Sequence, residues 1–249
     1  MNVVSLLCPR RDHKHWTDDY FECVKALDWS CQRLGLRHIV MTDDPALPVD
    51  CETFVNTDAP ESLMKATNWF YWKWCDQGNW AGGDTLFTGV DCLIVRDPQE
   101  TFDSVAGDMI MTARLNYPKR PINTGCTIVR RLARGRASIF WRNVFEATGD
   151  EWGDDLTAIA KTIPAAPTKF GEHGLPPYGM TVHYADLEQH NDKPRWSDET
   201  KYPTVAHFKG QVGKKLMLPW AAKRLGYPGF DLDAWQSTVA TIGTAADRR

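Results

Sequence analysis

The sequence lacks the long apolar runs of membrane proteins. None of its apolar segments approaches the roughly 20 residues that span a bilayer. The first residues, MNVVSLLCPRRD, have no basic region before the apolar run and no small-residue cleavage site, so they do not resemble a signal peptide. We therefore expect a cytoplasmic protein without a membrane span.

Paired cysteines are missing as well. The seven cysteines are an odd number, lie far apart and include no Cys-x-x-Cys pair, so the sequence indicates neither a disulfide framework nor a thiolate zinc site. Internal repeats and low-complexity tracts are also absent. A chain of 249 residues, 43% of them hydrophobic, can bury one substantial core. We expect a single domain over residues 1–230 and a C-terminal helix or tail over 231–249.

A strong excess of charge is absent too, but the net charge of −3 conceals segregation. Residues 114–142 hold eight Lys or Arg and no acid, and residues 207–230 hold five and no acid. Such segments are either solvated faces or a surface for an anionic partner. If the basic segments bind an anionic partner, we expect DNA or a glycan acceptor to bind through Arg114–Arg142.

Short apolar runs alternate with helical patterns along the chain. We expect strands at 2–8, 36–41, 53–56, 85–95, 109–113, 127–129 and 205–208. Helices are expected at 18–34, 61–76, 137–145 and 154–163, and one around Trp235, Val239 and Ile242. This alternation predicts a three-layer α/β architecture with a mixed, mostly parallel sheet. The run 85–95 is expected to form one central strand, and the polar loop 10–17 to lie where such sheets bind ligands.

Asp91 interrupts this apolar run. An unpaired carboxylate is costly to bury, so Asp91 either caps a turn, pairs with a base or binds a cation that neutralises a leaving diphosphate. The segment LFTGVDCLIVRDP, residues 86–98, resembles the Asp-x-Asp strand of family-8 glycosyltransferases, the group of glycogenin and the bacterial lipopolysaccharide galactosyltransferases. Asp91 takes the place of the second acid, and Gly89 stands where the family has the first.

Three further segments resemble the family's motifs in the same order. PINTGCTIV, residues 121–129, is similar to a strand whose Asn contacts the donor sugar. GDDL, residues 153–156, is similar to Gly-Asp-Gln-x-Leu, with Asp155 in place of the Gln near the anomeric carbon. HFKG, residues 207–210, is similar to a motif whose His completes a metal site and whose later Lys binds the diphosphate.

The resemblance implies a GT-A (nucleotide-diphospho-sugar transferase) fold and retaining transfer of a sugar from a UDP-sugar to an acceptor hydroxyl. It implies that Asp91 and His207 bind Mn²⁺ or Mg²⁺. The implied catalytic residues are Asp154, Asp155 and Asn123. The implied donor contacts are Lys73, Gly89, Asn123, Gly125, Gly210, Lys214 and Lys215.

Other functions stay open at this point. A sugar nucleotidyltransferase would share the fold class, but CPRRD follows the first strand in place of a glycine-rich loop. The glycine at position 89 also permits a non-catalytic protein that binds nucleic acid or carbohydrate. The basic segments permit a glycosyltransferase that acts on hydroxylated bases in DNA.

Overall fold

The computed structural model describes residues 1–9, 19–115, 117, 119–192, 194 and 202–236. The predicted polar loop at 10–17 lies outside these residues, as do Val239 and Ile242 of the expected C-terminal helix. Before that end, the amide of Trp235 donates to the carbonyl of Asp231 at 3.2 Å, which forms one helical turn.

Eight strands form the main sheet in the order β3-β2-β1-β4-β7-β6-β9-β8. The pairs β1–β2, β1–β4, β2–β3 and β6–β9 are parallel, and the other three are antiparallel, so the predicted mixed, mostly parallel sheet is confirmed. Its strands are β1 (Asn2–Leu6), β2 (Arg37–Thr42), β3 (Glu52–Val55), β4 (Thr85–Gly89), β6 (Met109–Ala113), β7 (Ile122–Val129), β8 (Gly171–Leu175) and β9 (Met180–Asp186).

The prediction of one strand over 85–95 is wrong. The chain turns at Val90 and Asp91 and continues as β5 (Cys92–Ile94), which belongs to a second sheet of order β10-β11-β5. In that sheet β10 (Asn191–Asp192) is parallel and β5 antiparallel to β11 (Val205–His207). Both β4 and β5 are buried, and therefore apolar residues continue on both sides of Asp91 and the sequence pattern does not reveal the turn.

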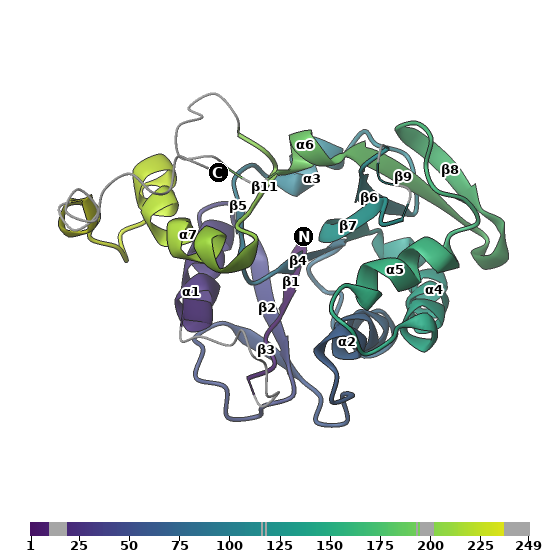
Figure 1. Ribbon diagram of the computed structural model, residues 1–249, viewed down its shortest axis with the longest axis horizontal. Coiled ribbons are helices and arrows are strands. Elements are labelled where there is room, and N and C mark those ends of the chain that lie inside the picture. The colour runs from purple at the N-terminus through teal and green to yellow at the C-terminus, as the bar shows by residue number, and fades with distance from the viewer. Residues whose placement is uncertain (10–18, 116, 118, 193, 195–201, 237–249) are drawn as a thin grey trace.

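Helices and the small sheet cover the two faces of the main sheet (Figure 1). One face carries α2 (Leu63–Gln77), α4 (Arg134–Ala147) and α5 (Asp154–Thr162), whose core includes Trp74 and Trp141. The other carries α1 (Asp19–Gln32), α7 (Gly210–Leu225) and the small sheet, together with the short helices α3 (Pro98–Phe102) and α6 (Leu187–His190). The sequence did not predict β8, β9 or α7. None of the helices in the described ranges is long and apolar enough to cross a membrane.

The strand directions bring several polar segments to one edge of the main sheet. The strands β1, β4, β6 and β9 run in the same direction, and their carboxyl ends lie at this edge. The antiparallel strand β7 begins at the same edge, where Asn123 lies opposite Thr112. Strand order also reverses beside β1, with β2 on one side and β4 on the other. Ligands of open α/β sheets bind outside the carboxyl ends of strands at such a switch point.

The opposite edge is fastened by an ion pair. The Nη1 atom of Arg130 lies 2.7 Å from Oδ2 of Asp84, and Oδ1 of Asp84 accepts the amide of Arg131 at 2.8 Å. Arg130 also donates to the carbonyls of Phe102 and Val105. Both charged side chains are less than one-fifth exposed, so each depends on the other to offset its desolvation.

We predict that Asp84→Ala lowers the free energy of unfolding by about 2–3 kcal/mol, because it leaves the mostly buried guanidinium of Arg130 without its carboxylate. Urea denaturation measures this change. The matched control is Glu146→Gln, which removes the well-exposed pair with Arg142 and should cost no more than about 0.5 kcal/mol. Equal costs in the two variants would contradict the prediction.

Candidate functional site

Asp91 and His207 meet at the carboxyl edge of the main sheet. Asp91 lies in the turn after β4, and His207 ends β11 opposite Cys92 of β5. The carbonyl of Asp91 accepts the amide of Phe208 at 2.8 Å, which holds the two segments together. As a result, Oδ1 of Asp91 lies 3.5 Å from Nε2 of His207.

A chain of hydrogen bonds determines which nitrogen of His207 carries the proton. The backbone amide of Gly125 can only donate, and it contacts Oδ1 of Asn123 at 3.0 Å. That oxygen therefore accepts, so the atom of Asn191 2.7 Å from it is the amide nitrogen. The amide oxygen of Asn191 then faces Nδ1 of His207 at 3.1 Å, and Nδ1 must donate. In the neutral ring, Nε2 consequently presents its lone pair to Asp91.

The charges at this pair suit a divalent cation. Burial lowers the pKa of His207 below its ordinary value, although Asp91 opposes this effect, so the imidazole is neutral at pH 7. Burial alone would raise the pKa of Asp91, but His207 and Lys214 outweigh it, and the net pKa is lowered. In the neutral ring two acceptors therefore face each other across 3.5 Å, and a proton or a cation between them satisfies both. A carboxylate and an imidazole are suitable ligands for Mn²⁺, and less so for Mg²⁺.

Cys92 is the third ligand type within 4.8 Å of this pair. Its thiol is buried on β5, and burial, followed by the charge of Asp91, raises its pKa well above the ordinary value. The thiol is protonated while no cation is bound, so we take Asp91 and His207, the two ligands that the sequence predicts, as the primary pair and Cys92 as a third ligand atom within reach.

The glycines at 89 and 125 leave room for these two side chains. A Cβ atom at Gly125 would lie 2.4 Å from Nδ1 of His207, so the imidazole rests directly on the backbone of β7. A Cβ atom at Gly89 would lie 2.5 Å from Oδ1 of Asp91. The residue that replaces the family's first acid therefore lets the remaining carboxylate fold back over the strand.

Basic groups from the start of α7 flank the pair. Lys214 is only 9% exposed, its ammonium lies 4.5 Å from the ring centre of Tyr20, and its charge lowers the pKa of Asp91. Lys215, the other predicted phosphate ligand, is exposed. Burial, followed by the charge of Arg114, lowers the pKa of Lys209 to about 8.

The first turn of α7 adds a partial positive charge. Gly210 opens the helix with φ at +71°, and the side chain of the N-cap residue Lys209 makes no capping hydrogen bond. Amide groups at such a helix start, together with the helix dipole, attract anions. Gly210 thus provides the left-handed backbone conformation with which the chain enters α7.

The two acids at the start of α5 have different surroundings. The carboxylate of Asp154 accepts the amide of Glu151 at 3.0 Å and thereby closes its own loop. Asp155 is half-buried, and burial raises its pKa despite the opposing charge of Arg120. Asp155 is therefore the better placed of the two to act on a ligand, and the predicted roles of both stay predictions.

Tyr71 of α2, which the sequence analysis did not single out, lies near the predicted acids Asp155 and Asp91. Its side chain is buried, and burial, followed by the charge of Asp155 and more weakly that of Asp91, raises its pKa. The hydroxyl hydrogen bonds the side chain of Thr124, which follows Asn123 on β7. A protonated phenol thus lies near both carboxylates. The only sequence signal is its place in the aromatic run of residues 69–74, and the structure packs its ring in the core.

Lys73 does not face the site. It lies two positions after Tyr71, about 200° further around the helix, and its ammonium lies 4.1 Å from the ring centre of Trp72. A linear motif gives the position of a residue near the site but not its phase on the helix, and the role of Lys73 as a donor contact stays a prediction.

The structure places the arginines that follow β7 away from the site, whereas the sequence predicted them at the acceptor-binding surface. Val129 pairs with Thr85, the first residue of β4, so Arg130–Arg136 lie at the opposite edge of the sheet from Asp91, about 13 Å along β4. Arg136 is paired there with Asp108. Within Arg114–Arg142, Arg114 and Arg120 remain beside the site, and the segment gives no support for DNA as the acceptor.

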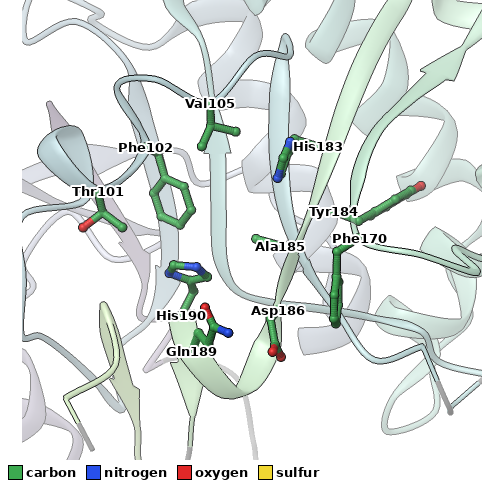
Figure 2. A pocket seen from close by; sticks show the side chains of 10 residues that line it. All are labelled: Thr101, Phe102, Val105, Phe170, His183, Tyr184, Ala185, Asp186, Gln189 and His190. Carbon is green, nitrogen blue, oxygen red and sulfur yellow. The ribbon is translucent and has the colours of Figure 1, made fainter.

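A separate cavity of about 310 Å³ lies beside α3 and α6 (Figure 2). Phe102, Asp186 and two histidines line it, among other residues. Burial lowers the pKa of both histidines, His183 and His190. Nδ1 of His190 lies 3.0 Å from the hydroxyl oxygen of Thr204. The next residue in the chain is Asn191, which hydrogen bonds His207. This cavity therefore adjoins the hydrogen-bond chain that includes Asn191, but the Asp91–His207 pair does not line it.

No family model matches the chain, and no curated protein matches it. Solved structures do match. A glycosyltransferase involved in the glycosylation of the major capsid of PBCV-1 is 13% identical with a TM-score of 0.54, over 86% of this chain and 96% of that chain. The galactosyltransferase LgtC, solved with donor and acceptor sugar analogues, is 12% identical with a TM-score of 0.50, over 99% of this chain and 98% of that chain. At such low identity the likeness concerns the fold alone, and the chain has the GT-A fold that the sequence predicts.

Proposed function

We propose that the protein is a metal-assisted, retaining glycosyltransferase that moves a sugar from a UDP-sugar to an acceptor hydroxyl, and that residues 1–230 form its single domain. The observation that carries this proposal is the geometry of Asp91 and His207. An ionised carboxylate faces the lone pair of a neutral imidazole at 3.5 Å, beside the switch point of a GT-A sheet. A cation bound there would supply Lewis-acid stabilisation of the leaving diphosphate.

The chain's own groups prepare this site for a diphosphate. Asn191 fixes the imidazole by accepting from Nδ1, as the partners of metal-binding histidines commonly do. Lys214, Lys209 and the first amides of α7 supply positive charge on the adjoining side. Because these groups are held in place before the reaction, they stabilise the negative charge that develops on the leaving group without reorganisation.

Asn123, Asp155 and Tyr71 are the groups proposed to bind the sugar. The oxygen of Asn123 is already engaged with Gly125 and Asn191, so its amide nitrogen is the atom that donates to a sugar hydroxyl. Asp155 brings a negative charge that stabilises oxocarbenium character at the anomeric carbon. The protonated hydroxyl of Tyr71 can donate to the same sugar, since its high pKa keeps the proton on it.

UDP should raise the melting temperature by roughly 5 °C or more at saturating concentration with Mn²⁺, because it binds only the folded state. Differential scanning fluorimetry with UDP, GDP and CDP, each with Mn²⁺, Mg²⁺ or chelator, measures this. The shift should shrink with chelator. The absence of any shift for every nucleoside diphosphate and ion would refute the proposed function.

Asp91→Asn and His207→Ala should each lower turnover by roughly 10²- to 10³-fold, because each removes a ligand of the same cation. The double variant should be hardly slower than either single one, since a site that lacks one ligand already fails. UDP release measured against Mn²⁺ concentration tests both statements. Full activity in Asp91→Asn with an unchanged Mn²⁺ response would eliminate the metal assignment.

Lys214→Met should raise the KM for the donor by about 10-fold, because a charged hydrogen bond to a phosphate is lost. Lys215→Met is the matched control: it removes the same charge from the next, exposed position and should leave the KM unchanged. Steady-state kinetics with varied donor distinguishes them. Equal effects of the two substitutions on the KM would contradict a specific contact between Lys214 and the phosphate.

A further inference from the structure

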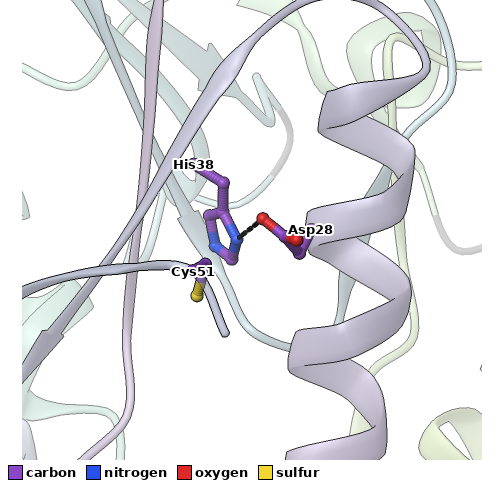
Figure 3. A group of neighbouring side chains, drawn as sticks. All are labelled: Asp28, His38 and Cys51. Atoms are coloured by element: carbon purple, nitrogen blue, oxygen red, sulfur yellow. Dashed lines mark hydrogen bonds and ion pairs between the residues drawn. The ribbon is translucent and has the colours of Figure 1, made fainter. Parts of the chain in front are cut away.

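A second group of metal-ligating side chains lies on the face of the main sheet that α1 covers. Asp28 of α1, His38 of β2 and Cys51, which precedes β3, each offer one ligand atom, and these atoms lie within 4.8 Å of one another (Figure 3). His38 is near the amino end of β2, about 13 Å along the strand from the carboxyl edge where Asp91 and His207 lie. The group is therefore separate from the proposed donor site.

Ser5 completes a hydrogen-bond chain behind the imidazole. Its hydroxyl lies 3.0 Å from Nε2 of His38, and Nδ1 of His38 lies 3.1 Å from Oδ1 of Asp28. This Ser-His-Asp order resembles the relay of a hydrolase. However, Ser5 lies on β1 between two neighbouring strands and is fully buried, so no scissile carbonyl can reach its oxygen. A nucleophilic role is thereby excluded.

We propose that Asp28, His38 and Cys51 bind a divalent transition-metal ion of the Zn²⁺ class. One carboxylate oxygen, one imidazole nitrogen and one thiolate sulfur form a ligand set typical of zinc and unlike those of Mg²⁺ or Ca²⁺. A cavity of about 260 Å³ adjoins Asp28 and Cys51 and also includes Gln32 and Tyr227. It has room for the water that occupies the fourth position of a three-ligand zinc site.

Ser5 permits the imidazole to change its tautomer without the loss of a hydrogen bond. Without metal, Nδ1–H donates to Asp28 and Ser5 donates to Nε2. With metal, Nδ1 gives its lone pair to the ion, the proton resides on Nε2, and the Ser5 hydroxyl accepts from it. A hydroxyl can perform both roles, whereas most buried partners cannot. Ser5 is thus a positioning residue for the ligand His38.

Coordination by Cys51 breaks the S–H bond, forms the metal–sulfur bond and releases one proton to solvent. The positive charge of the ion also offsets the carboxylate of Asp28, which lies beside the thiolate.

The ion would join three segments that are distant in sequence. α1, β2 and the loop before β3 each contribute one ligand, and His38 already holds the first two together through its bond to Asp28. A metal that binds the folded arrangement and finds no preformed site in the unfolded chain raises stability. We therefore infer that the ion, when bound, stabilises the β3 edge of the sheet.

Titration of the full chain with Co²⁺ tests the proposal, because thiolate ligation produces a charge-transfer absorption band. One ion should bind per chain with this band, and Asp91→Asn should retain it, which separates this site from the donor site. Cys51→Ser should lose the band, and Asp28→Asn should weaken binding at least 100-fold. Ser5→Ala should weaken it about 10- to 100-fold. Glu22→Gln, an exposed carboxylate on the same helix, is the control and should change nothing.

In the Asp91→Asn background, Zn²⁺ should also raise the melting temperature, and the further substitution Asp28→Asn should abolish this rise. Asn keeps the shape of the Asp28 side chain, which guards against a folding defect in Cys51→Ser. The proposal is overturned by the absence of the band in the wild type, by a band that survives Cys51→Ser, or by its loss in Asp91→Asn. Failure of UDP to bind would leave these outcomes unaffected.

Discussion

The hydrogen bond from the backbone amide of Gly125 to Asn123 is the interaction on which the site depends. A backbone amide cannot change its role, and so it orders every other group in the chain: the oxygen of Asn123 accepts, the nitrogen of Asn191 donates, and the oxygen of Asn191 accepts from His207. The direction of Nε2 toward Asp91 follows from this order. A strand of the main sheet thereby sets the chemistry of a side chain on the small sheet.

The close approach of these groups requires that two positions have no side chain. Gly125 lets the imidazole rest on β7, and Gly89 lets the carboxylate of Asp91 fold back over β4. The turn between β4 and β5 serves the same end, because it carries the chain from the main sheet to the strand that pairs with His207. An acid at position 89 would place a second negative charge in the space that Asp91 occupies. The departure from the Asp-x-Asp pattern and the turn therefore belong to one arrangement.

Much of the fold followed from the sequence, because buried parallel strands and amphipathic helices leave strong patterns. The pairing of Asp91 with His207 followed as well, through a resemblance rather than through any spacing. Three features could not be derived from the sequence. The turn after Gly89 lies within an apolar run, Lys73 depends on helical phase, and the arginines after β7 depend on strand direction. Pattern reading in one dimension gives the type of an element but neither its partners nor the way it faces.

His207 and His38 show how one partner atom decides what an imidazole can do. Asn191 presents an amide oxygen that is held as an acceptor, so the neutral ring of His207 has one tautomer, whose lone pair faces Asp91. Ser5 presents a hydroxyl that can donate or accept, so His38 can exchange tautomers at little cost. In the proposed function, the first ring is preorganised for the cation that holds the donor's diphosphate. The second can satisfy its carboxylate partner without an ion and adapt when one binds, which suits a site whose occupancy follows the supply of metal.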